Sequence, residues 1–168
     1  MSLFNRVINL FKKAEPPQPE KSILTVSPGD IVEVSLVTYE VIGRTRHSQR
    51  NSVFLTIQDG SMVRFLQIEE REKLKYEVYD QIDGRLDSFD EIPTTLELEG
   101  TLYFLEEQYA GNVTVTGKTP FSKDGEMHVW RFQSDNRKLI RIEWLDGRLI
   151  MYEGESLLPA DVQVIRSN

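Results

Sequence analysis

The second half of this 168-residue chain repeats the residue pattern of its first half. A Val-x-Gly motif followed by a basic residue and threonine, then a polar loop and two runs rich in apolar residues, occurs twice in the same order. The two copies differ in spacing within the polar loop, where an insertion costs little. The pattern predicts a duplicated β unit whose halves share packing, because either half alone would have a marginal core. The matching segments are 41–45, 53–59 and 63–69 in the first half and 115–119, 129–135 and 138–143 in the second.

The composition limits the chemistry available to this chain. It contains no cysteine, which excludes disulfides, thiolate nucleophiles and cysteine-ligated zinc. Its only imidazoles are those of His47 and His128. No apolar run approaches the roughly 20 residues that cross a bilayer, and the N-terminus has neither a continuous apolar core nor a small-residue cleavage site. We therefore expect a cytoplasmic protein.

Negative charge is concentrated in the middle of the chain. Residues 69–107 contain thirteen acidic and four basic residues, a net charge of −9, whereas the whole chain carries −7. This charge repels phosphate backbones and no basic stripe offsets it, so we expect no nucleic-acid binding. Two interpretations remain open: a solvated connector between the repeats, or a surface for a basic partner. The acids do not follow the spacing of a calcium-binding loop.

The first 22 residues differ in character from the rest. Apolar residues at helical spacing predict an amphipathic helix over residues 1–13, followed by a proline-rich linker over residues 14–22. The β body, a partner protein or a bilayer could cover the apolar stripe, and its basic residues favour anionic lipid or an acidic partner. The residues predicted to bind a membrane or partner are Leu3, Phe4, Val7, Ile8, Phe11, Lys12 and Lys13.

Beyond residue 22, short β-branched and aromatic runs alternate with turn signals. Asp-Gly pairs that begin at residues 59, 83, 124 and 146 suit the positive φ angles of tight hairpins. The pattern predicts a mainly β fold of two pseudo-repeated antiparallel β units, sandwich-like or barrel-like, packed together over residues 23–92 and 93–168. The stretch 102–110 also fits a helical turn. The predicted strands are 31–37, 39–46, 52–58, 62–69, 74–79, 95–98, 101–106, 112–118, 127–134, 137–144, 148–153 and 162–165.

Ordered aromatic, glycine and glutamate positions give the chain a resemblance to a known family. They are Gly29-Asp30, Tyr39–Gly43, Leu102-Tyr103 with Glu106 and Ala110, Gly117, Trp130, Ile142–Trp144, Tyr152–Gly154 and Asp161-Val162. Over roughly residues 27–165 the chain resembles the bacterial domain of unknown function DUF4178, with Phe54 where we would expect tryptophan. The resemblance implies a small β-rich bacterial domain, in a family associated with envelope-stress and membrane-protein neighbours. It implies no reaction, ligand or catalytic residue.

The charged residues offer one candidate pair for chemistry. Glu69 and Glu143 lie at matching strand ends and could form a carboxylate pair for acid–base or metal work. Alternatively, each glutamate pairs with an arginine, such as Arg64 or Arg141. Neither histidine has a nucleophile to activate, so we expect both to be solvent-exposed or on an edge strand. We predict no catalytic residue, no cofactor and no metal site.

Aromatic residues recur on successive predicted strands, where they usually stack as core. Trp144 is the best candidate for exposure, because it lies next to the turn at Asp146-Gly147. We therefore predict it at the rim of a partner surface or cleft, with Glu69 and Glu143 as the other candidates for that surface.

Two classes of function agree with these observations. The first is a non-enzymatic binding or scaffold module at a membrane or membrane-protein complex, with a protein or an anionic membrane surface as partner and homo-oligomers as an option. The second is a small enzyme or ligand-binding β domain that uses a cleft between the repeats. A cleft in which Glu69, Glu143 and a histidine converge would favour the second class, whereas a filled apolar core would favour the first.

Overall fold

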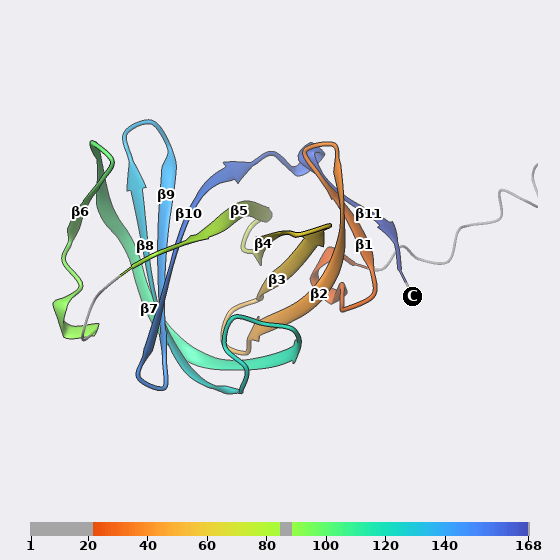
Figure 1. Cartoon of the computed structure of the whole chain (residues 1–168), viewed down its shortest axis with the longest axis horizontal. Coiled ribbons are helices and arrows are strands. Elements are labelled where there is room, and N and C mark those ends of the chain that lie inside the picture. Colours follow the sequence, from red (N-terminus) through yellow and green to blue (C-terminus); the bar gives the residue numbers. More distant parts are fainter. Residues whose placement is uncertain (1–21, 85–88, 168) are drawn as a thin grey trace, which may run out of the picture.

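The computed structural model describes residues 22–84 and 89–167, which form antiparallel strands with short connections (Figure 1). Within these residues there is no α-helix, only three 3-10 turns. The elements of the first half are η1 (Ile23–Thr25), β1 (Ile31–Val34), β2 (Val37–His47), β3 (Ser52–Asp59), β4 (Met62–Glu70) and β5 (Leu74–Ile82). Those that follow are η2 (Phe89–Glu91), β6 (Thr95–Leu98), β7 (Thr101–Gly117), β8 (Gly125–Ser134), β9 (Lys138–Leu145), β10 (Arg148–Leu157), η3 (Pro159–Asp161) and β11 (Val162–Arg166).

Tight two-residue turns join several neighbouring strands. Both turn residues have positive φ angles at Ser35-Leu36, Glu99-Gly100 and Asp146-Gly147, which suits the right-handed twist of the flanking strands. The prediction of a hairpin at every Asp-Gly pair is wrong at two sites. Asp83-Gly84 follows the end of β5, and Asp124-Gly125 ends the longer loop between β7 and β8.

Eight strands form a closed antiparallel barrel. The strands β2 to β5 pair in chain order, and so do β7 to β10. Two pairings, which we call the seams, join the halves: β5 pairs with β10, and the C-terminal part of β2 pairs with β7 from Gly43 opposite Gly117 to His47 opposite Val113. The barrel alternative is therefore correct and the sandwich alternative is not.

The strands β1, β6 and β11 lie outside the barrel ring. β1 pairs with the start of β2 and with β11, and β6 pairs with the start of β7. A bulge follows each of these outer pairings, between Val41 and Gly43 in β2 and between Leu105 and Glu107 in β7. Because a bulge bends a strand, each long strand can leave its outer partner and enter the barrel.

Apolar side chains fill part of the barrel interior and come from both halves. Phe54 stacks on Phe65 with ring centroids 5.4 Å apart, and the edge of Tyr152 meets Phe54 at 5.3 Å. Leu139 and Val129 of the second half belong to the same cluster. The expectation that the halves share a core is therefore confirmed.

Two further apolar clusters lie on the outer faces of the barrel strands. One contains Leu55 and Leu66 of the first half, packed with Val34 of β1 and Val162 of β11. The other contains Trp130, Phe132, Ile140 and Ile142, packed with Leu96 and Leu98 of β6. The outer strands thus cover apolar surface that the barrel would otherwise expose to water.

Residues 102–110 belong to one long strand, β7, so the option of a helical turn is wrong. The predicted strands 101–106 and 112–118 are parts of this single element. The bulge between Leu105 and Glu107 shifts which alternate positions face inward. The sequence therefore shows two short periodic runs where the backbone forms one strand.

The residue-by-residue match between the two halves is wrong in register. The match equates Val53 with Val129, but Val53 packs outside the barrel and Val129 inside it. Because side chains alternate along a strand, an offset of one residue places a side chain on the opposite face. Gly43 and Gly117, also equated by the match, are direct partners across the β2–β7 seam.

The N-terminal predictions fall almost entirely outside the described residues. This holds for the helix over 1–13 and for the linker up to residue 21; Ser22 is described, and its hydroxyl accepts a hydrogen bond from the Leu24 amide at 3.3 Å. No helix in the described part of the chain is long and apolar enough to span a membrane. The binding residues that lie outside are Leu3, Phe4, Val7, Ile8, Phe11, Lys12 and Lys13.

Candidate functional site

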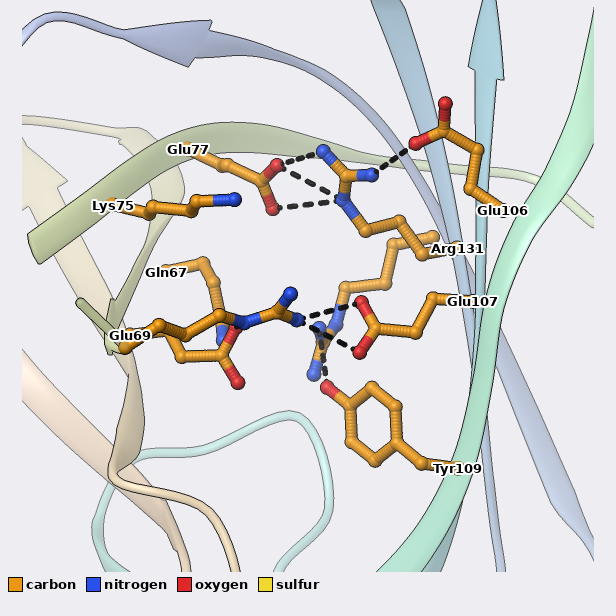
Figure 2. Close-up of a pocket in the computed structure, with 10 residues that line it drawn as sticks. Gln67, Glu69, Lys75, Glu77, Glu106, Glu107, Tyr109 and Arg131 are labelled. Atoms are coloured by element: carbon orange, nitrogen blue, oxygen red, sulfur yellow. Dashed lines mark hydrogen bonds and ion pairs between the residues drawn. The ribbon is translucent and has the colours of Figure 1, made fainter. Parts of the chain in front are cut away.

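A cavity of about 350 Å³ lies between the two halves of the barrel (Figure 2). Its volume falls in the range of small-molecule binding sites. The side chains come from β4, β5 and their connecting turn on one side and from β7, β8 and β9 on the other. All of them are polar: Gln67, Glu69, Arg71, Lys75, Glu77, Glu106, Glu107, Tyr109, Arg131 and Arg141.

The alternation of the strands explains why charged side chains reach the interior. In β5, Glu77 and Tyr79 share a face, and Tyr79 belongs to the apolar cluster inside the barrel. In β9, Arg141 lies two residues from Leu139, which belongs to the same cluster. One part of the barrel interior is therefore apolar, and the neighbouring part carries the charges.

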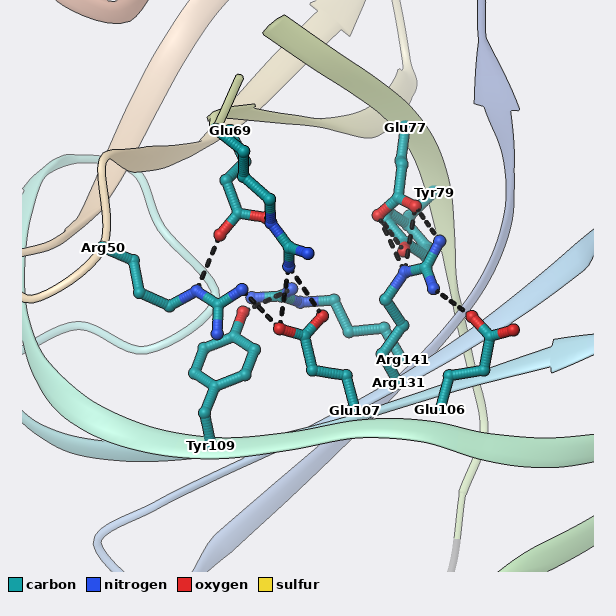
Figure 3. A network of polar contacts seen from close by, with 10 residues as sticks. Arg50, Glu69, Glu77, Tyr79, Glu106, Glu107, Tyr109, Arg131 and Arg141 are labelled. Carbon is teal, nitrogen blue, oxygen red and sulfur yellow. Dashed lines mark hydrogen bonds and ion pairs between the residues drawn. The ribbon is translucent and has the colours of Figure 1, made fainter. Parts of the chain in front are cut away.

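Four residues form a closed ring of ion pairs beside the cavity, which we call the charge ring: Arg50, Glu69, Arg71 and Glu107 (Figure 3). Arg50 Nε lies 2.6 Å from Glu69 Oε1, and Arg71 Nη2 lies 2.8 Å from Glu107 Oε1. Arg71 also bonds Glu69, at 3.0 Å, and Arg50 bonds Glu107. The guanidinium of Arg50 covers the ring of Tyr109 at 3.8 Å.

The charge ring keeps Glu107 ionised. Burial alone would raise the pKa of this carboxyl, but the hydrogen bond and positive charge of Arg50, with a further contribution from Arg71, lower the pKa below its usual value. Glu107 is therefore a carboxylate at neutral pH.

A second group of ion pairs crosses the cavity at Arg131. Its Nε lies 2.9 Å from Glu77 Oε2, and its Nη1 lies 2.8 Å from Glu106 Oε2 (Figure 2). The hydroxyl of Tyr79 donates to Glu77 Oε1 at 2.8 Å. Burial acts to lower the pKa of Arg131, but the hydrogen bond and charge of Glu77 outweigh it, so the pKa is raised. These bonds tie β5 to β7 and β8.

Arg141 and Glu143 form a buried ion pair next to the cavity. Arg141 Nε lies 2.9 Å from Glu143 Oε2, and both side chains are only 2% exposed. Arg141 Nη1 also donates to the hydroxyl of Tyr109 at 3.3 Å (Figure 3), whereas its Nη2 has no hydrogen-bond partner among the described residues. Burial opposes the charge of Arg141, but Tyr109 and Glu143 favour it, and its pKa is raised well above the ordinary value.

His47 is buried, so the prediction that it is solvent-exposed or on an edge strand is wrong. Its side chain is at the end of β2, which pairs with both β3 and β7, and it meets the ring of Tyr109 edge-on at 5.4 Å. Burial first, and then the charges of Arg141 and Arg50, lower its pKa to about 3. His128 is half-exposed, with Nε2 3.4 Å from Glu126. Neither histidine lines the cavity.

The structure separates the three candidates for a partner surface. Glu69 lines the cavity, and Glu143 lies beside it, bonded to Arg141. Trp144 is half-buried and packs against the apolar cluster under β6. Each of the two glutamates pairs with arginine, as the alternative predicted. The partner of Glu69 differs from the one suggested: Glu69 bonds Arg50 and Arg71, whereas Arg64 bonds Asp80 at 2.9 Å. Among residues 22–84 and 89–167, no three His, Asp or Glu side chains are arranged to hold a metal ion.

Most of the cavity cannot be predicted from the sequence. Residues 69–107 have the composition of a solvated connector or a partner surface, yet four glutamates of this segment line the cavity. Arg50, Tyr109 and Arg131 belong to no recognisable motif. In β9, Arg141 and Glu143 alternate with isoleucines, which is the ordinary pattern of a strand with one solvated face, yet here both charged side chains are buried and the isoleucines pack outside the barrel.

The comparisons with known proteins give a family. No curated protein and no solved structure matches the chain. The family profile described as "Domain of unknown function (DUF4178)" matches residues 27–159. This range contains all eight barrel strands and every residue that lines the cavity. The chain therefore belongs to the DUF4178 family.

Proposed function

We propose that this protein is a non-enzymatic binding module whose barrel cavity takes a small polar ligand. The observation that carries the proposal is a cavity of about 350 Å³, lined by polar side chains from both halves, next to the buried and unpartnered Nη2 of Arg141. A buried donor without a partner costs about 1–3 kcal/mol, part of which a bound ligand would recover. The cavity lies in the cleft between the repeats, which here would bind a ligand and would not carry out a reaction.

The ion pairs favour binding over catalysis. A general acid or base works best when its pKa lies near the working pH. The pKa of Glu107 is lowered, against the effect of burial, by Arg50 and Arg71, and the pKa of Arg131 is raised by Glu77, likewise against burial. Both groups therefore hold their charge at neutral pH. His47 has a pKa of about 3 and does not line the cavity.

The N-terminal segment supplies the second part of the proposal. Its apolar residues between Leu3 and Phe11, with Lys12 and Lys13, would attach the barrel to an anionic membrane surface or to a protein partner at the inner face of the membrane. The helix predicted over residues 1–13 is short and would bind weakly alone, so the proposal includes a homo-oligomer or a membrane partner. Only the sequence supports this part.

We also infer that the barrel consists of two copies of one five-strand unit. Each half has a short outer strand, a long bulged strand and three further strands joined in chain order. Corresponding strands pair at both seams, β2 with β7 and β5 with β10. Such pairing is what an approximate twofold axis between the copies would produce.

Thermal unfolding of the full chain with four probes tests the binding proposal. Glycine, succinate, putrescine and glucose represent a zwitterion, a dianion, a dication and a neutral polyol. We expect at least one of them to raise the Tm and to bind in calorimetry. Lys75→Ala should weaken that effect, because Lys75 lines the cavity, whereas Lys138→Ala, also at an exposed position, should not. Stabilisation by none of the probes, or equal stabilisation of both variants, contradicts the proposal.

A further inference from the structure

The charges that line the cavity cancel. Four of the lining residues are arginines or lysine and four are glutamates. All except Lys75 are bonded to an oppositely charged side chain, and Lys75 has no ion pair among the described residues. The cavity without ligand therefore carries no net charge, although it contains many charged groups.

This balance works against a charged ligand. Within the described part of the chain, the one cation of the lining without an ion pair is Lys75, which is exposed and therefore hydrated, so pairing with it gains an anionic ligand little. Any other charge on a ligand would break an existing ion pair or remain uncompensated in a partly buried site, and both are unfavourable away from water. The pair of Glu77 and Arg131 is well shielded, since these side chains are 12% and 18% exposed. A ligand without net charge avoids both penalties.

Donors and acceptors alternate along the lining. Arg131 lies between Glu77 and Glu106, and Arg71 lies between Glu69 and Glu107. A hydroxyl group can donate to a carboxylate and accept from a guanidinium at the same time. A row of neighbouring hydroxyls can therefore bridge these groups and leave the charge balance unchanged.

Two buried atoms of the lining residues lack partners in the described part of the chain. Arg141 Nη2 is a donor and Gln67 Oε1 is an acceptor, and the residues that carry them are 1% and 4% exposed. Buried polar atoms are normally hydrogen-bonded. A hydroxyl group can accept from the Arg141 guanidinium and donate to the Gln67 amide oxygen, so one kind of ligand group matches both atoms.

We propose that the cavity binds an uncharged polyhydroxyl ligand of the saccharide class. This inference rests on the proposed function, because it names the ligand class of the same cavity. The four glutamates and four basic residues select against net charge, and the alternating donors and acceptors select for hydroxyl groups.

Calorimetry with three related probes tests the inference. Glucose, glucuronate and glucosamine share one ring and differ in charge. For the full chain we expect glucose to bind at least about tenfold more tightly than the other two. Equal or tighter binding of glucuronate or glucosamine overturns the inference but leaves the binding proposal in place, as does binding of glycine, succinate or putrescine without binding of glucose. Binding of no probe in either set overturns both.

Two charge-changing variants test the inference through the relative affinities of the probes, so the result does not depend on how tightly glucose binds. Glu106→Gln makes the lining more positive by one charge and should improve glucuronate relative to glucose by about tenfold. Lys75→Gln makes it more negative and should improve glucosamine in the same way. Both side chains are largely exposed, so folding should be retained, as an unchanged Tm would verify. The control is Glu97→Gln on β6, outside the cavity. If the preference does not change, or changes equally in the control, charge balance does not select the ligand.

Discussion

Gly43 and Gly117 face each other across the β2–β7 seam, and neither position has room for a side chain. A Cβ atom on Gly43 would lie 1.8 Å from the carbonyl oxygen of Lys118. One on Gly117 would lie 2.4 Å from the carbonyl oxygen of Ile42, at a φ of +73°. Both obstacles are backbone atoms, so a side chain could enter only if the seam opened. The closure of the barrel therefore depends on these two glycines.

Replacing either seam glycine should destabilise the barrel. We expect Gly43→Ala to lower the free energy of unfolding by about 2–4 kcal/mol, and Gly117→Val by about 3 kcal/mol or more because φ strain adds to the clash. Urea denaturation measures both. Gly125→Ala is the control, since the nearest neighbours of its Cβ would be side-chain carbons of Leu145 at 3.6 Å or more. It should change stability by less than about 0.5 kcal/mol. A Gly43→Ala variant as stable as that control would contradict the close approach.

Acidification should lower the free energy of unfolding through the buried side chain of His47. Its pKa is about 3 in the folded protein, against about 6.5 when unfolded, so the unfolded chain binds the proton first as the pH falls. Stability is therefore complete above pH 6.5 and declines below it, with about 2 kcal/mol lost through this group between pH 7 and pH 5. Denaturation at several pH values should show a shallower slope for His47→Gln than for the unaltered chain. Equal slopes for the two proteins would refute the assignment.

The buried pair of Arg141 and Glu143 should tolerate the loss of one partner poorly. Glu143→Gln leaves the guanidinium of Arg141 buried without its carboxylate, which typically costs about 3–5 kcal/mol. Glu126→Gln removes an exposed carboxylate near His128 and should cost less than about 0.5 kcal/mol. Chemical denaturation distinguishes the two. A small effect at Glu143 would mean that water or another group already compensates Arg141.

The first half should not fold alone. A fragment of residues 23–92 has no β7 or β10, so β2 and β5 lose their seam partners, and Phe54, Phe65 and Tyr79 lose part of their packing. We expect an aggregating or poorly structured chain in circular dichroism and size-exclusion chromatography. A soluble monomer that melts cooperatively would show that the shared core is dispensable.

Removal of residues 1–20 should abolish attachment to membranes. In co-sedimentation with anionic liposomes, the full chain should pellet with the liposomes at low salt. Part of it should move to the supernatant at high salt, because Lys12 and Lys13 contribute electrostatic attraction. The shortened chain should stay in the supernatant at both salt concentrations. Equal recovery of both chains in the supernatant, with an unchanged Tm on truncation, would leave only attachment through a protein partner.

The strands could be predicted from the sequence because their signals are local. Alternation and turn residues placed β9 at 137–144, against the observed Lys138–Leu145. The closed barrel could not be predicted in the same way. Closure depends on Gly43 meeting Gly117 and on β5 meeting β10, and alternation does not specify which distant strands pair. The bulges also shift the alternation, which explains why the match between the halves is out of register at Val53 and Val129.

The cavity was harder to predict than the strands. Glu69 was identified from its place at a strand end, but its partners Arg50 and Arg71 lie in connecting segments with no recognisable motif. Arg131 and Glu77 meet only because β5 and β8 face each other across the barrel interior. Residue types and spacing describe one strand at a time, whereas this site is made by five strands and two connecting segments that converge in space.

The two seams determine when the chain can fold during its synthesis. Gly43 can pair across its seam only after Gly117, 74 residues further along the chain, has been synthesised. Val78 can likewise pair across the other seam only after Glu155, 77 residues further along. Until the ribosome has released most of the second half, β2 and β5 each have an unpaired edge that can recruit another nascent chain. Each seam contact also requires closure of a loop of this length, and the entropy cost of that closure slows folding. The long sequence separation of the seam partners therefore exposes the nascent chain to aggregation during translation.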